Sequence, residues 1–418
     1  MLDSKTLDIV KSTAPVLKEH SKEIGMRFYH LLFAKAPELY NIFNQTNQKR
    51  GMQQEALAYA VYAAGENIDH LDAIKPLVMR IAEKHRALGV KPEQYPVVGD
   101  TLLQAVKDVL GDAATDDVIQ AWAAAYHEIA EAFIDIEKEL YKEAEEVPGG
   151  WAGFREFIVD QKIPETDFVT SFYLKPKDGG TLSTYQAGQY LTLKATIPGE
   201  TYTHMRHYSL SDAPGKDYYR ISVKREDARG DAPAGIVSNF LHNHIQVGDV
   251  LSFAAPAGDF TLSNGQNPVV LISGGIGLTP VMSMLETLAR DQPERSVTYI
   301  HATLNSANHA MKKRVDVLVE KNDNIKRYTC YEKPSAEDLA AHHYDKEGYI
   351  DQHWLANLLP PNQEADIYFC GPIPFMTAVN NALKGLGIPK ERSHYEVFNP
   401  ISILEEIEPS REGEPMTV

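Results

Sequence analysis

The chain has 418 residues, a mass of 46.6 kDa and a formal net charge of −17. Hydrophobic residues make up 43% of it and charged residues 24%, which excludes a mostly disordered chain and a collagen-like one. At about 100–200 residues per domain, this length predicts two to four domains. The acidic balance disfavours nucleic acid and anionic membrane surfaces as partners.

No segment indicates export or membrane insertion. No apolar run reaches the roughly 18 residues that a spanning helix needs, so we expect no integral membrane association. The start, MLDSKTLDIVKSTAPVL, has acidic residues early and lacks the apolar stretch of a secretory signal. The only cysteines are Cys330 and Cys370, which excludes a disulfide framework. We therefore expect a cytoplasmic protein.

The first third of the chain has a helical pattern. Apolar residues recur at helical spacing in 71–88 and in 118–141, and both stripes are expected to be buried. His85 interrupts the first stripe. Long amphipathic segments without a strand pattern predict an all-α domain over 1–147. Charges, a proline and paired glycines in 142–150 predict a domain boundary.

From residue 151 the apolar period changes to strand-like alternation. Phe172 and Leu174 alternate with polar neighbours, and so do Ile221 and Val223. Short strands separated by glycine and proline predict an antiparallel β-barrel domain over 151–263.

A third pattern covers 267–404. Buried strands are expected at 268–272, 297–302, 325–330, 366–370 and 394–398. Helical patterns at 280–289 and 308–321 lie between them. This alternation predicts an α/β domain with a doubly wound parallel sheet. Residues 405–418, with five glutamates, are expected to form a mobile acidic tail.

A glycine-rich loop follows the first strand of this α/β region. Its glycines let the backbone approach a phosphate, and Thr279 is expected to cap a helix that begins at Pro280. The next strand ends at Ala302-Thr303 without an acidic residue for a ribose hydroxyl, which disfavours a plain dehydrogenase. Cys370 ends another strand, where ligands bind in such sheets; taken alone, it is best explained as an inert buried thiol.

The barrel region contains Arg206-His207-Tyr208-Ser209. Arginine can bind a pyrophosphate, tyrosine can stack on a flat ring, and a serine hydroxyl can bond a ring nitrogen. Alone, these four residues are better explained as a solvated edge strand. In chain order, however, R-x-Y-S, G-x-V-S, G-G-x-G-x-T-P and C-G-P form a set that closely resembles the ferredoxin–NADP reductase superfamily over about 150–400.

That resemblance implies a flavin site and a nicotinamide nucleotide site. FAD would be bound by Tyr190, Arg206, His207, Tyr208, Ser209, Gly235, Val237 and Ser238, with Glu396, Val397, Phe398, Asn399 and Pro400 near its ring. NADH or NADPH would be bound by Gly274, Gly275, Ile276, Gly277, Leu278, Thr279, Pro280, Cys370, Gly371 and Pro372. Hydride would pass from the nicotinamide to the flavin, which then releases single electrons.

The helical region resembles a globin, and its fusion to the reductase closely resembles the bacterial flavohaemoglobins over all but the acidic tail. That resemblance implies haem b with His85 as the iron ligand. The other residues that it implies are Phe43 against the porphyrin, Tyr29 and Gln53 facing O₂, Leu57 closing the pocket, Tyr95 and Glu137 hydrogen-bonded around His85, and Lys84 between haem and flavin. Taken singly, they have simpler explanations: a core histidine, an interfacial tyrosine, an exposed glutamate and a solvated lysine.

The activity that this resemblance implies is nitric oxide dioxygenation. NAD(P)H would reduce FAD, FAD would reduce the haem, and O₂ on the reduced haem would oxidise NO to nitrate. The partners are then NO, O₂ and NAD(P)H, and we expect a monomer. Three alternatives stay open: reduction of NO or peroxides at the same site, a haem-based gas or redox sensor, and a reductase whose globin-like domain holds no haem. A 2′-phosphate of NADPH could be held by Lys312, Lys313 and Arg314, although a solvated helix face is the simpler role.

Overall fold

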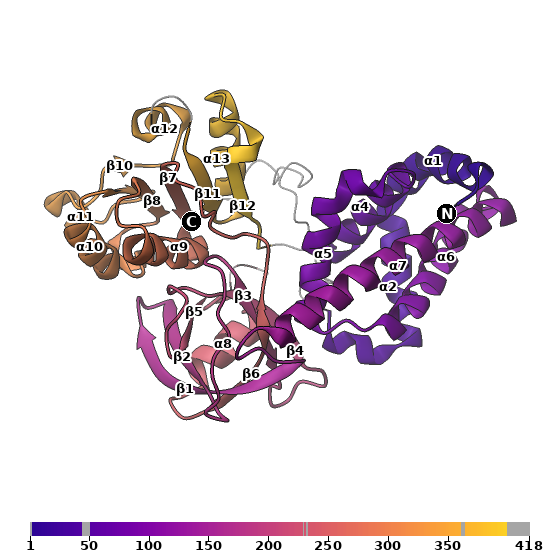
Figure 1. Cartoon of the computed structure of the whole chain (residues 1–418), viewed down its shortest axis with the longest axis horizontal. Helices are drawn as coiled ribbons and strands as arrows, with labels where there is room; N and C mark the ends of the chain where they lie inside the picture. The colour runs from indigo at the N-terminus through magenta and orange to yellow at the C-terminus, as the bar shows by residue number, and fades with distance from the viewer. Residues whose placement is uncertain (1, 44–50, 229, 231–232, 361–363, 399–418) are drawn as a thin grey trace. The chain divides into compact units, whose positions relative to one another are not determined.

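The computed structural model describes residues 2–43, 51–228, 230, 233–360 and 364–398 (Figure 1). Asn399, Pro400 and the tail at 405–418 lie outside these described residues. The first part is helical, as predicted. Its α-helices are α1 (Ser4–Glu19), α2 (Ser21–Lys35), α4 (Met52–Glu66), α5 (Lys75–Leu88), α6 (Tyr95–Leu110) and α7 (Asp116–Glu146). Within the described ranges, no helix combines the length and apolar composition needed to cross a membrane.

Local chemistry accounts for the ends of these helices. The side chains of Asp3 and Thr115 accept backbone hydrogen bonds and so cap α1 and α7. Helix α5 has Pro76 in its first turn and ends at Gly89, whose φ of 79° suits glycine. α7 continues to Glu146, so the first five residues of the segment 142–150 are helical.

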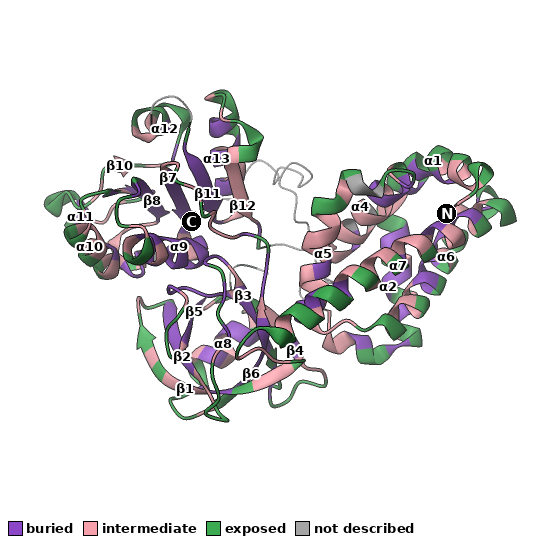
Figure 2. Cartoon of the chain, viewed as in Figure 1, coloured by how far each residue is buried: buried purple, intermediate pink, exposed green. Residues whose placement is uncertain are grey.

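The helical core forms between α1, α2, α6 and α7, where the helices turn their buried sides toward one another (Figure 2). Phe28, Leu32 and Trp122 are members of it, as the periodicity predicts. The stripe on α5 differs from the prediction: its apolar residues are only half-buried, while Ala82 and Ala87 on the other side are buried. This stripe therefore forms a wall of intermediate exposure rather than a core face.

The middle of the chain forms a six-stranded sheet in the order β4-β3-β6-β1-β2-β5. Its strands are β1 (Phe154–Pro164), β2 (Val169–Pro176), β3 (Tyr190–Ala195), β4 (His204–Ser209), β5 (Tyr219–Lys224) and β6 (Val250–Ala257), with α8 (Ile236–Asn243) before β6. β2 pairs antiparallel with β1 and β5. A bridge between Leu210 and Ile221 links the residue after β4 to β5, so the two edges of the sheet meet as in a barrel.

The burial of the polar residues on β5 differs from the predicted alternation of buried and exposed positions. Arg220 and Ser222 are buried as deeply as Ile221 and Val223. Arg220 is held by Asp212, with Nη1 and Oδ2 3.4 Å apart, and by the hydroxyl of Ser211 at 3.1 Å. Both faces of β5 are therefore enclosed, and the buried charge is paired.

The last part is a parallel sheet in the order β10-β9-β8-β7-β11-β12. Its strands are β7 (Val269–Gly274), β8 (Val297–Thr303), β9 (Ile325–Tyr331), β10 (Lys346–Glu347), β11 (Asp366–Cys370) and β12 (Ser393–Glu396). The helices are α9 (Leu278–Asp291), α10 (Lys312–Lys321), α11 (Ala336–Ala341), α12 (Gln352–Leu358) and α13 (Ile373–Gly385). One sheet face packs on α9 and α10, and the other packs on α12 and α13 (Figure 1). The predicted doubly wound class is confirmed.

Two predicted helix starts were wrong. α9 begins at Leu278 after a 3₁₀ turn, and its N-cap is Gly277. Thr279 therefore lies inside the first turn, where its hydroxyl donates to the carbonyl of Ile276 at 3.0 Å. The pattern at 308–321 becomes a helix only at Lys312.

Candidate functional site

Three polar residues meet on the inner side of α5. Nδ1 of His85 lies 2.7 Å from Oε1 of Glu137 on α7 and 3.1 Å from the hydroxyl of Tyr95 at the start of α6. The same hydroxyl donates to Oε1 of Glu137 at 2.5 Å. Glu137 is 2% exposed, so its explanation as a solvated helix-edge glutamate is wrong. Burial, followed by the charge of Glu137, holds the pKa of Tyr95 well above its usual value, and the phenol stays a donor.

This arrangement determines the tautomer of His85. A carboxylate only accepts hydrogen bonds, so Nδ1 of the imidazole carries the proton and Nε2 carries a lone pair. No described residue hydrogen-bonds to Nε2. An imidazole oriented by a carboxylate, on a half-buried apolar stripe beside Phe133 at 5.9 Å, has the donor chemistry for a haem iron. The residues present therefore fit a haem.

The residues expected on the distal side also gather in the helical part. Tyr29 is buried, and its hydroxyl lies 3.5 Å from the backbone oxygen of Gln53. Its ring packs edge-on against Phe43, with the centroids 5.4 Å apart. Leu57 and Phe43 are partly buried against the same core. The explanation of Tyr29 as an interfacial residue is thus wrong, whereas Lys84 remains half-exposed on α5.

The expected flavin residues of the barrel lie on β3 and β4. Tyr190 is buried and packs 4.7 Å from the ring of His207, centroid to centroid. It also covers Gly258, where an added Cβ would lie 2.9 Å from the tyrosine ring. Arg206 and Tyr208 are half-buried on one face of β4, and Nη1 of Arg206 donates to the carbonyl of Met205 at 2.7 Å.

The second part of the expected flavin site is the start of α8. Gly235 is the N-cap, and no side chain caps this helix. Ser238 is buried, and its hydroxyl is engaged within the protein. It donates to the carbonyl of Gly235 and accepts from the N–H of Glu226, both at 3.2 Å. Backbone N–H groups near Val237 are thus the available donors for a phosphate, and Ser238 shapes the turn.

The glycines of the nucleotide loop do more than approach a phosphate. A Cβ on Gly277 would lie 2.3 Å from the carbonyl oxygen of Cys370, and one on Gly274 or Gly371 would lie 2.9 or 2.5 Å from the ring of Phe375. The two expected binding segments, 274–280 and 370–372, are therefore packed directly on each other. Only Gly275, at φ 49°, has a backbone that itself favours glycine.

The terminal strand β12 brings Glu396 beside Cys370 in parallel register. Burial, and then the charge of Glu396, raises the pKa of the Cys370 thiol well above its usual value. This supports an inert thiol at that position. Val397 is buried, whereas Phe398 is 51% exposed at the end of the described chain.

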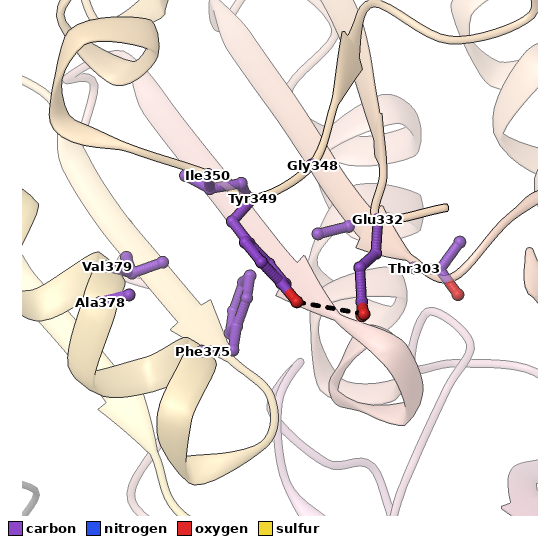
Figure 3. A pocket seen from close by; sticks show the side chains of 9 residues that line it. Thr303, Glu332, Gly348, Tyr349, Ile350, Phe375, Ala378 and Val379 are labelled. Atoms are coloured by element: carbon purple, nitrogen blue, oxygen red, sulfur yellow. Dashed lines mark hydrogen bonds between the residues drawn. The ribbon is translucent and has the colours of Figure 1, made fainter. Parts of the chain in front are cut away.

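Residues that the sequence did not single out line a pocket at the carboxyl ends of β8 and β9. Glu332, Tyr349 and Phe375 form its walls, together with Thr303 (Figure 3). Glu332 lies two residues after the predicted strand 325–330, so the rule for strand ends applied there could have found it. Within the described residues, no cluster of three or more His, Cys, Asp or Glu side chains could hold a metal ion.

Comparison with known families agrees with this three-part organisation. The Globin family matches residues 26–133, the oxidoreductase FAD-binding domain matches 160–262, and the oxidoreductase NAD-binding domain matches 271–381. Among solved structures, the flavohemoglobin of Malassezia yamatoensis, described with bound FAD and heme, has a TM-score of 0.82 at 27% identity and covers 95% of this chain and 100% of its own. The FAD/NAD binding domain of nitric oxide dioxygenase from Vibrio cholerae O1 biovar El Tor is 42% identical, with a TM-score of 0.53, and covers 58% of this chain and 98% of its own.

Relatives match over nearly the whole length. The flavohemoprotein of Bacillus thuringiensis subsp. konkukian (strain 97-27) is 53% identical over 406 residues, which are 97% of this chain and 100% of that protein. The flavohemoprotein of Bacillus subtilis (strain 168) is 50% identical over 401 residues, which are 96% of this chain and 98% of that protein. The chain therefore belongs to the flavohemoprotein family.

Proposed function

We propose that this chain is a nitric oxide dioxygenase that consumes NAD(P)H, with haem b in its helical part and FAD in its barrel part. The observation that carries the proposal is the His85–Glu137–Tyr95 arrangement, in one chain with a flavin and a nucleotide fold. When bound, FAD splits a hydride into single electrons, and haem supplies one-electron and O₂ chemistry. A globin that only stored O₂ would need no attached reductase.

The helical residues hold one side of the reaction. Glu137 keeps the proton of His85 on Nδ1 and makes Nε2 a stronger electron donor. On the opposite side we place Tyr29 beside Gln53; its buried hydroxyl, which here donates to the backbone oxygen of Gln53, would turn to donate to a diatomic substrate. Phe43 and Leu57 keep this side apolar and limit the access of water.

The remaining residues bind and orient the electron donors. The N-terminus of α8 and the fork of Arg206 suit a pyrophosphate, and Tyr208 and Ser209 suit the flavin ring. Residues 274–280 and 370–372 receive the nicotinamide nucleotide, with Glu396 and Phe398 at the hydride-transfer end. We further propose that Lys84 lies on the electron path, that NO and O₂ are the substrates, and that the protein is a cytoplasmic monomer.

The first test is an anaerobic titration of the purified protein with NADH while its absorption spectrum is recorded. We expect the flavin bands to bleach first and the haem to become ferrous afterwards. In air, NO should then disappear with nitrate as the product, and this loss should require NADH. His85→Ala should abolish haem retention and leave flavin reduction intact.

Three outcomes would contradict the proposal. If the flavin bleaches and the haem stays ferric, the electron path is broken. If NADH consumption with NO is faster without O₂ than with it, the chain is an NO reductase. Retention of haem without turnover would instead favour a sensor.

A further inference from the structure

The pocket between β8, β9 and α13 lies at the edge of the parallel sheet where ligands bind. Thr303 ends β8 and Glu332 follows β9. The backbone N–H of Glu332 donates to the carbonyl of Thr303 at 3.0 Å, which fixes this carboxylate beside the end of β8. The sequence has no acid at the end of β8 itself, so the neighbouring strand supplies it.

The Glu332 carboxylate is only half satisfied. It is 8% exposed, and Oε1 accepts a hydrogen bond from the hydroxyl of Tyr349 at 3.1 Å (Figure 3). Oε2 is buried and has no hydrogen-bond partner among the described residues. The one ion pair of this carboxylate within the described part of the chain is with Nζ of Lys333, 3.7 Å from Oε1, on a side chain that is 75% exposed. A buried carboxylate oxygen without a donor is costly, which indicates a ligand that brings one.

The pocket and the nucleotide loops share one aromatic ring. Phe375 lines the pocket, and it is also the ring that Gly274 and Gly371 touch. Phe375 therefore places the pocket next to the segments where the pyrophosphate of a dinucleotide is expected. Tyr349 adds a 42% exposed flat ring, suited to stacking on a base.

We propose that Glu332 accepts hydrogen bonds from the adenosine ribose of NADH, and that the same carboxylate makes this chain select NADH over NADPH. The proposal rests on the use of NAD(P)H in the function proposed above. A ribose hydroxyl donates to Oε2, whereas the 2′-phosphate of NADPH only accepts and brings negative charge against a carboxylate. Selectivity here comes from repulsion as well as from the new hydrogen bond.

Two of the three basic residues considered for a 2′-phosphate are engaged elsewhere. Nζ of Lys312 pairs with Asp316 at 2.9 Å. Arg314 pairs with Glu286 and donates to both carboxylate oxygens of Asp212 at 3.1 Å. Of the three basic residues considered for a 2′-phosphate, only Lys313 is fully exposed, and it does not line the pocket.

The test measures binding rather than turnover. The full-length protein carrying haem and FAD is titrated calorimetrically with ADP-ribose and with 2′-phospho-ADP-ribose. We expect the wild type to bind ADP-ribose about 100-fold more tightly. Glu332→Gln should reduce this ratio about tenfold, mainly by tightening the phosphorylated ligand. Glu347→Gln, at an exposed position nearby, removes the same charge and should leave the ratio unchanged. Tyr349→Phe should weaken the binding of ADP-ribose and keep the preference for it over 2′-phospho-ADP-ribose.

The ratio of the two affinities in the wild type is measured without any variant, so the proposal stays testable even if Glu332→Gln is unstable. A wild-type ratio near one, or an equal ratio in the wild type and in Glu332→Gln, would overturn it. Failure of NADH to reduce the flavin at all would instead count against the proposed function. Reduction by NADH with unchanged selectivity in the variant would overturn only the role of Glu332.

Discussion

At the scale of single residues, the decisive feature is one carboxylate oxygen with two donors. Oε1 of Glu137 accepts from Nδ1 of His85 and from the hydroxyl of Tyr95. The burial of Glu137 at 2% exposure keeps water from replacing either donor. The ligand atom of the imidazole is thereby oriented by residues that never touch the substrate.

Glu137→Gln should remove the negative charge behind His85 and keep a hydrogen-bond acceptor. The imidazole is then a weaker electron donor to the iron. We therefore expect a higher reduction midpoint potential for the haem and about tenfold slower NO consumption. Spectroelectrochemistry measures the potential. Tyr126→Phe is the matched control, because it removes a hydroxyl that donates to the backbone of Tyr95 and leaves Glu137 in place. An unchanged potential in Glu137→Gln would refute this role.

Two buried histidines, one on β8 and one after it, predict how stability depends on pH. Burial lowers the pKa of His301 to about 3, and burial, followed by the effects of His301, Lys312 and Arg327, lowers the pKa of His309. Both are neutral when folded, while the unfolded chain takes up protons below about pH 6.5. Stability should thus be full above pH 6.5 and fall on acidification, by about 2.7 kcal/mol per pH unit for the two groups together.

Urea unfolding between pH 7 and 5 measures this slope. His309→Gln should remove about half of it, whatever its effect on stability at pH 7. His127→Gln, at a 72% exposed position, should leave the slope as it is. A slope that is equal in His309→Gln and in the wild type would exclude this origin.

The sequence predicted the roles of these residues to different extents. Ordered motifs and resemblance were enough to name His85, Tyr95 and Glu137 together. Periodicity could not show the burial of Glu137, because it follows Ile136 on a helix whose apolar stripe is only partly buried. Glu332 was within reach of the rule for strand ends. Its orphaned oxygen, however, depends on side-chain packing that no local pattern encodes.

At the scale of elements, the start of α9 coincides with a tertiary contact. Local propensity favours Thr279 as the cap, but the N-cap is Gly277, which packs directly on Cys370. The strands and the doubly wound parallel class of the sheet were predictable because buried apolar runs alternate with helical segments. The exact start of a helix that packs on another loop was not.

Gly277→Ala should force the loop away from β11, since the added Cβ would lie 2.3 Å from a backbone oxygen. We expect a loss of about 1–3 kcal/mol in the free energy of unfolding and weaker NAD⁺ binding. Urea unfolding and calorimetry measure both. Gly265→Ala is the control, because its Cβ would meet no atom closer than 3.6 Å. Wild-type behaviour of Gly277→Ala would show that the loop adapts freely.

At the scale of the whole molecule, a buried ion network joins the barrel to the parallel sheet. Asp212, after β4, accepts from Arg314 of α10 and from the hydroxyl of Tyr218, and its carbonyl accepts from Ser283 of α9 at 2.6 Å. Burial opposes the charge of Arg314, yet Glu286 and Asp212 hold its pKa above the usual value. Residues 102 positions apart make this contact, so no sequence pattern could predict it.

Asp212→Asn should uncouple the flavin and nucleotide parts. Removing one partner of a buried pair costs about 3–5 kcal/mol, and we expect slower reduction of the flavin by NADH with an unchanged haem spectrum. Stopped-flow absorption measures the rate. Asp291→Asn breaks an exposed pair with Arg290 and should change little. Equal rates in both variants would contradict this coupling. The domain limits 1–147, 151–263 and 267–404 stay predictions.

The oxygen that His85 and Tyr95 share has a consequence for how such a protein can evolve. The hydrogen bond that Tyr95 donates to Oε1 reduces the negative charge available to the imidazole. Tyr95 therefore weakens the effect of Glu137 on the electron-donating strength of His85. A lineage could therefore retune the electron affinity of its iron through an uncharged neighbour. The histidine, the carboxylate and the packing of α5 would all be conserved while the redox behaviour drifts.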